Sequence, residues 1–134
     1  MNPSWLQTAS VVCAVILAAV AIFQLMLYAG MPYGEYGWGG RHAGVLPHRL
    51  RRWSLLSAFL LLAMGFVYLL HAGTVAIDSS FAWTSVLCWV ITAFLGLNML
   101  GNLASRSPKE KRAMTPLSGA AFILGLLISA YGAS

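Results

Sequence analysis

The residues best suited to chemistry lie in one polar stretch between two apolar runs, PYGEYGWGGRH at positions 32–42. Glu35 supplies a carboxylate that can accept a proton, and His42 supplies a group that titrates near neutral pH. Arg41 and Arg49 are suited to holding an anionic group. The candidate site residues in and just after this stretch are therefore Glu35, Tyr36, Trp38, Arg41, His42 and Arg49.

A structural interpretation competes with this catalytic one. Glu35 is equally able to form an ion pair with Arg41 or with Arg106, which would tie two connections together while the aromatic residues occupy the membrane interface. The many glycines of the stretch rule out an ordinary helix, since each costs about 1 kcal/mol relative to alanine. They do not form a phosphate-binding GxxxxGK[ST] motif. The stretch is thus expected to be a loop, and a partly inserted, re-entrant loop is one form open to it.

The elements that must position this loop are membrane helices. The chain has 134 residues, of which 60% are hydrophobic and only 8% are charged, whereas a soluble domain has roughly 25% charged residues. Spanning a membrane takes about 20 apolar residues. The sequence therefore predicts an all-α, polytopic membrane protein, a single bundle of four transmembrane helices at about 5–28, 53–72, 81–104 and 116–131. No charge precedes Glu35, so the first run is expected to be a permanent helix and not a signal peptide.

Two start signals precede the fourth helix. Ser107, Pro108 and Glu110 occupy the N-cap, N1 and N3 positions of a capping box, which predicts a short surface helix. Thr115 and Pro116 repeat the signal and predict the start of the fourth span.

The distribution of charge predicts the orientation. All eight basic residues fall in the first and third connections, and the positive-inside rule places such connections in the cytoplasm. Both termini, and the turn that contains Asp78, are then expected on the outer side. His71, at the end of the second span, would be able to pair with Asp78 there.

Five polar side chains fall in the cytoplasmic half of the spans at about 1.5 Å per residue: Gln24, Ser57, Asn98, Asn102 and Ser118. Facing inward, they would line a polar cavity above the loop, with Gln24, Asn98 and Asn102 as candidate ligand-binding residues. Alternatively, they act as interhelical hydrogen bonds worth roughly 0.6 kcal/mol each. Cys13 and Cys88 lie at similar depth in the outer half, where two buried thiols are favoured over a disulfide.

Several partners are not expected. The basic residues are explained by orientation and by anionic lipid, so nucleic acid is not predicted. His71 lies at the opposite end from His42 and His48, so no three-histidine metal site is predicted. No cofactor motif is present. The expected partners are membrane lipids, with a homo-oligomer as a further option.

The motifs PYGEYGWGGRHAGVLP and NLASRSPKEKRAMTP resemble those of a group of small bacterial integral membrane proteins with four helices. The resemblance covers most of the chain and implies the topology and a bacterial inner-membrane location. It transfers no activity and no catalytic residue. Small multidrug transporters are a poorer match, because their first span carries a carboxylate and this one has only Gln24.

Three functions are consistent with these features. The first is a non-enzymatic membrane protein that binds a lipid or amphiphile, or assembles with itself, through the cytoplasmic loops and the inner polar cavity. The second is a membrane enzyme that acts on an isoprenoid or lipid headgroup, with Glu35 and His42 as acid and base. The third is a channel or small transporter built by an oligomer, with a path lined by Asn98 and Asn102.

Overall fold

The computed structural model describes residues 4–38, 42, 44–73, 82–105 and 107–132. Over these residues the chain is all-helical, and its elements are α1 (Ser4–Tyr28), the short 3-10 helix η1 (Gly34–Tyr36), α2 (His48–His71), α3 (Ala82–Leu103) and α4 (Pro108–Tyr131). The four α-helices are each long and apolar enough to cross a membrane. The predicted all-α architecture with four such helices is confirmed.

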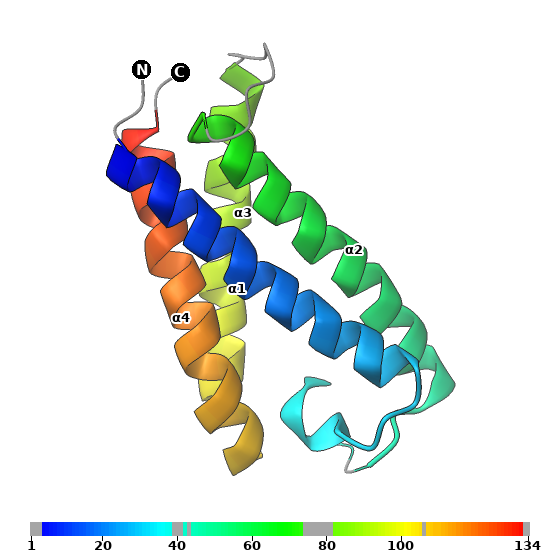
Figure 1. The fold of residues 1–134 in the computed structure, drawn as a ribbon. Coiled ribbons are helices and arrows are strands. Elements are labelled where there is room, and N and C mark those ends of the chain that lie inside the picture. The colour runs from blue at the N-terminus through cyan, green and yellow to red at the C-terminus, as the bar shows by residue number, and fades with distance from the viewer. Residues whose placement is uncertain (1–3, 39–41, 43, 74–81, 106, 133–134) are drawn as a thin grey trace.

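The helices form two antiparallel pairs, α1 with α2 and α3 with α4, which cross one another (Figure 1). Both chain ends lie at the same end of the bundle, where the rings of Trp5 and Tyr131 meet edge to face with centroids 5.9 Å apart. Toward the opposite end α1 and α4 diverge, and the α1–α2 connection with η1 lies between them (Figure 1). The polar stretch singled out in the sequence is therefore placed against the first turn of α4.

Small residues let the helices approach closely. A Cβ added at Gly65 on α2 would lie 3.4 Å from the Cα of Ala14 on α1, so the two backbones are nearly in contact. Lipid offers no hydrophobic drive between helices, and close van der Waals packing takes its place. Cys13 and Cys88 belong to this core as free, fully buried thiols, as predicted.

A chain of hydroxyl groups joins three helices in the half of the bundle nearer the termini. The Tyr68 Oη atom on α2 lies 2.7 Å from Thr92 Oγ1 on α3. Thr92 Oγ1 in turn lies 3.1 Å from Ser129 Oγ on α4. Tyr68 and Thr92 are almost completely buried. Gly125 on α4 accommodates the phenol, since an added Cβ would come within 2.5 Å of Tyr68 Oη. Buried hydroxyl groups in hydrocarbon need hydrogen-bond partners. These linked hydroxyl groups therefore fix how α2, α3 and α4 pack.

Two helix boundaries differ from those predicted. α2 begins at His48, directly after Pro47, and not near Trp53. Arginine and leucine are good helix formers, so the basic segment 48–52 continues the helix beyond the apolar run that hydropathy detects.

The prediction of a separate surface helix before the fourth span was wrong. α4 runs without interruption from Pro108 to Tyr131 and contains Pro116 in its interior. Ser107 does act as the N-cap, accepting a hydrogen bond from the Glu110 amide at 3.4 Å. The capping signal at Ser107 thus starts the whole span, and Thr115–Pro116 does not restart it.

Candidate functional site at the polar end of the bundle

The α1–α2 connection is folded back on itself. The Gly34 amide donates to the Gly44 carbonyl at 2.8 Å, which closes the loop. A side chain on Gly34 would collide with the carbonyl oxygens of His42 and Gly44, so glycine is required there for this close backbone approach. Among the residues described between α1 and α2, the regular structure is the single turn η1.

Two hydrogen bonds anchor the loop and the start of α2. Trp38 has a left-handed backbone, with φ of 55°, and its indole N–H donates to the buried Ser54 Oγ at 2.9 Å. Arg51 Nε donates to the carbonyl of Tyr28 at 3.0 Å and so satisfies a terminal carbonyl of α1. The candidate residue Trp38 is therefore part of the scaffold of the loop.

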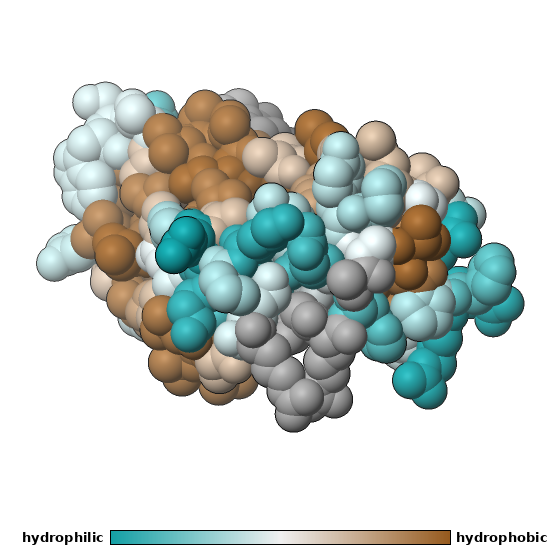
Figure 2. Space-filling model, turned by 90° about the horizontal axis from the view of Figure 1, so that it is seen from below, coloured by the Kyte–Doolittle hydropathy of each residue, from teal (hydrophilic) through white to brown (hydrophobic). Residues whose placement is uncertain are grey.

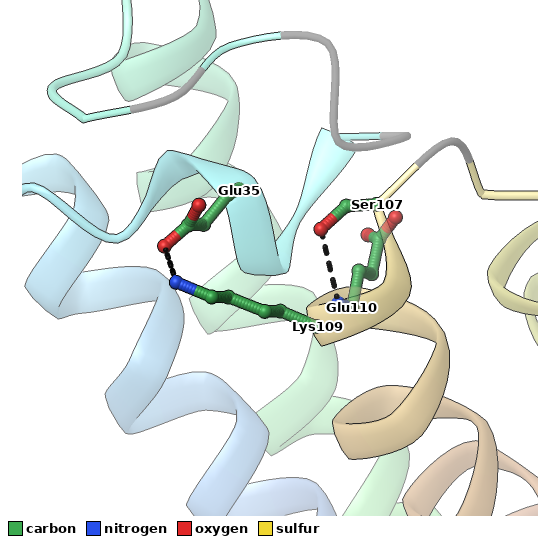
Figure 3. Close-up of polar contacts among 4 residues, drawn as sticks. All are labelled: Glu35, Ser107, Lys109 and Glu110. Atoms are coloured by element: carbon green, nitrogen blue, oxygen red, sulfur yellow. Dashed lines mark hydrogen bonds and ion pairs between the residues drawn. The ribbon is translucent and has the colours of Figure 1, made fainter.

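Glu35 forms an ion pair with Lys109 in the first turn of α4, with Nζ 2.7 Å from Oε1 (Figure 3). The same ammonium lies 5.9 Å from the ring centroid of Tyr36, and Tyr36 packs edge to face on Phe23 and Tyr33. The observed ion pair thus ties the loop to the first turn of α4. Arg41 and Arg106, the partners predicted for Glu35, lie outside the described residues.

Glu110 is buried beside this ion pair, at 4% exposure. In a complete capping box its carboxylate would accept from the Ser107 amide, but that amide donates to Ser105 Oγ at 3.1 Å. The Glu110 Oε1 atom is buried and makes no hydrogen bond to any residue that the structure describes. Its position in the first turn of α4, where the helix dipole favours negative charge, offsets part of the cost of burial.

Cations at the starts of α2 and α4 lie at the same end of the bundle as the loop. Four cations on the described residues are exposed and take part in no described ion pair: Arg49, Arg52, Lys111 and Arg112. Figure 2 shows hydrophilic residues gathered across this end of the molecule and apolar residues bordering them. We call these four residues the basic rim.

A small cavity lies beside three of the five side chains that were predicted to line a polar one, Asn98, Asn102 and Ser118. It has a volume of about 30 Å³ and is lined by apolar side chains of all four helices together with Asn98, Asn102 and Ser118. Asn102 Nδ2 donates to Ser118 Oγ at 2.9 Å, so part of the lining is an interhelical hydrogen bond. Ligand pockets usually measure roughly 300–1,000 Å³, and a water needs about 10–15 Å³. The cavity therefore fits one or two waters and not a headgroup.

The remaining candidate residues are not brought together. No hydrogen bond or ion pair joins Glu35 to His42 in the part of the chain that is described, and His42 is half-buried. Gln24 does not line the cavity, and its buried Oε1 makes no hydrogen bond within the described part of the chain. Asp78, the predicted partner of His71, lies outside the described residues, and His71 instead lies 3.1 Å from Thr84 Oγ1.

Sequence reasoning missed the Lys109 partner and the hydroxyl chain. A signal for the second was present in the small residues Gly125 and Ser129, which share one face of α4 by i, i+4 spacing. Comparison of the chain with protein-family models, curated proteins and solved structures gave no match, so the site is interpreted from its own geometry.

Proposed function

We propose that this chain is a non-enzymatic integral membrane protein that binds anionic lipid headgroups at its basic rim. One observation carries the proposal: the rim residues Arg49, Arg52, Lys111 and Arg112 are exposed on one end face of a membrane bundle and take part in no described ion pair. Exposed cations at this depth attract anionic lipid by about 1 kcal/mol each.

The orientation and location follow the same electrostatics. The basic end faces the cytoplasm, both termini lie outside, and the membrane is the bacterial inner membrane, whose lipids include anionic ones. Support comes from the eight basic residues, which all belong to the first and third connections or the helix starts that follow them. This is the arrangement that the positive-inside rule describes.

The two alternative functions receive less support. An enzyme would need Glu35 beside His42, whereas Glu35 is paired with Lys109. A solute path would need more room than a cavity of about 30 Å³ provides. The headgroup is therefore expected to bind on the outside of the bundle, at its rim, and not within it.

Spin-labelled phospholipids test the proposal. We compare the selectivity of the purified protein in bilayers for phosphatidylglycerol over phosphatidylcholine, using electron spin resonance to count motionally restricted lipid. Changing Arg49, Arg52, Lys111 and Arg112 to glutamine is expected to lower the selectivity several-fold. The matched control exchanges Arg for Lys and Lys for Arg at the same positions, which keeps the charge and should keep the selectivity.

Soluble glycerol phosphate separates a membrane lipid from a free anion. Membrane headgroups are favoured if millimolar glycerol phosphate leaves the selectivity unchanged, and a free phosphate ligand is favoured if it abolishes the selectivity. Equal association of the two lipids with the wild type, or no loss in the glutamine variant, would contradict the proposal.

A further inference from the structure

The small cavity between the four helices has polar groups on its wall. Asn98 and Asn102 of α3 and Ser118 of α4 border it among apolar side chains. Asn102 Nδ2 donates to Ser118 Oγ at 2.9 Å, and Ser118 Oγ donates to the Met114 carbonyl at 2.7 Å. The side chain of Asn98, by contrast, makes no hydrogen bond to any residue that the structure describes. The wall therefore combines a hydrogen-bonded pair of side chains with one amide that has no described partner.

The depth of Asn98 makes an unpartnered amide costly. α3 has 22 residues and ends at Leu103, which at about 1.5 Å per residue matches a hydrocarbon core of roughly 30 Å. Asn98 then lies about 7 Å inside the edge of that core. Its side chain is exposed, but hydrocarbon offers an amide no partner, and polar groups at such depth face other protein or water. The partner of Asn98 is therefore expected on the cavity side.

Water fits the cavity in both size and chemistry. A water needs about 10–15 Å³, so the volume of about 30 Å³ holds one or two. A buried water typically makes about three hydrogen bonds. The Asn98 amide carries donors and an acceptor, and the Asn102 side-chain carbonyl and the Ser118 hydroxyl offer further acceptors. A metal cation is disfavoured, because none of the residues that line the cavity is acidic.

Two buried oxygens near the cavity also lack a described partner. Gln24 lies one turn from the lining residue Val20 on α1, and Glu110 lies one turn from the lining residue Met114 on α4. Both lie on the side of the cavity nearer the polar end of the bundle. The Oε1 atoms of both are buried and make no hydrogen bond to the described residues. Ordered water commonly satisfies such atoms, so this half of the bundle has several groups that water would stabilise.

We propose that the cavity is a water-binding site, in which one or two bound waters join Asn98 to Asn102 and Ser118. The waters complete the hydrogen bonds of Asn98 and connect α3 to α4 inside the hydrocarbon core. The site is separate from the basic rim, whose residues do not line the cavity. Failure of one proposal therefore leaves the other standing.

Solid-state NMR in lipid bilayers tests whether water contacts Asn98. With 15N-labelled asparagine the chain has three side-chain amides, those of Asn2, Asn98 and Asn102, and Asn98→Leu identifies the signal of Asn98 by its loss. We expect the Asn98 amide to receive proton polarisation from water at short mixing times, although it lies at hydrocarbon depth. Polarisation that reaches this amide from lipid chains alone would overturn the proposal.

Hydroxyl-radical footprinting tests whether the water lies in the cavity. Radicals that X-rays generate from water oxidise a methionine beside that water, so Met114, which lines the cavity, is compared with Met64. Both residues are half-buried, but Met64 packs against the apolar core. In lipid nanodiscs Met114 should be oxidised several-fold faster than Met64. Equal rates would count against water in the cavity.

Three variants connect the oxidation to Asn98. Asn98→Leu has a similar size but no hydrogen-bonding group, so it should slow the oxidation of Met114 several-fold and leave Met64 unchanged. Asn98→Ser keeps a hydroxyl group and should retain most of the oxidation. Leu97→Ala is the control, because Leu97 is exposed and does not line the cavity. Oxidation of Met114 that Asn98→Leu leaves unchanged would show that the radicals come from bulk water, and would overturn the proposal.

Discussion

At the scale of single residues, a tight steric constraint lies where Gly125 faces the Tyr68 phenol. Because an added Cβ would come within 2.5 Å of Tyr68 Oη and 3.0 Å of Thr92 Oγ1, Gly125→Ala must either displace the phenol or break its hydrogen bond. We expect a loss of about 1–3 kcal/mol in the free energy of unfolding, as for other overpacked cores. Unfolding in mixed detergent micelles measures it.

Gly101→Ala is the matched control for this prediction. Gly101 is also helical but has open space around its Cβ position, so alanine should be neutral or add up to about 1 kcal/mol through its helix propensity. Equal destabilisation by the two substitutions would mean that crowding at Tyr68 is not the cause.

At the scale of elements, the start of α4 depends on its N-cap. Ser107 Oγ accepts from the Glu110 amide at 3.4 Å, a long hydrogen bond, so Ser107→Ala should cost toward the lower end of the range of about 0.5–2 kcal/mol found for N-caps. Ser107→Thr retains the oxygen and should restore most of the stability. Unfolding monitored by far-UV circular dichroism tests both, and a loss that Ser107→Thr fails to restore would argue against the cap.

The ion pair between η1 and α4 should behave as a surface interaction. The side chains of Lys109 and Glu35 are 57% and 32% exposed, and exposed pairs gain little because water and salt screen them. A double-mutant cycle with Glu35→Gln and Lys109→Gln should therefore give a small coupling at low salt that disappears in 1 M salt. A coupling that persists at high salt would show that the loop shields the pair more than the structure indicates.

The helix boundaries also show how much of the fold can be predicted from the sequence. The four spans were predictable because apolar length is a direct consequence of membrane thickness. The start of α2 at His48 was not, since hydropathy reports the hydrocarbon boundary near Trp53 and is insensitive to the helical turns beyond it. Pro116 was misinterpreted for a related reason, because a start signal inside a helix resembles one that begins it.

The site was predictable in its location but not in its pairing. Clustered glycines and charges identified the loop that meets α4. The pairing of Glu35 with Lys109 depends on where η1 meets the first turn of α4, and sequence spacing does not encode that contact. Likewise, Tyr68, Thr92 and Ser129 lie on three separate apolar runs, and only the packed bundle brings their hydroxyls together.

At the scale of the whole molecule, the two ends of the bundle differ in charge. The end that holds η1 also holds the basic rim and Lys109, while the described residues at the other end bring the aromatic rings of Trp5 and Tyr131 together. Positive charge is retained on the cytoplasmic side during insertion. The molecule as a unit is therefore expected to adopt one orientation, with both termini outside.

Thiol labelling in intact cells tests this orientation. In a Cys13→Ala, Cys88→Ala background, Ser4→Cys should react with a membrane-impermeant maleimide from outside, whereas Arg49→Cys should react only after the membrane is permeabilised. Both positions are exposed in the structure, so burial does not explain a difference. The background protein without cysteine gives the blank. Labelling of Arg49→Cys in intact cells would reverse the assignment, and equal labelling of both variants would indicate that the chain inserts in two orientations, which the segregation of its charges argues against.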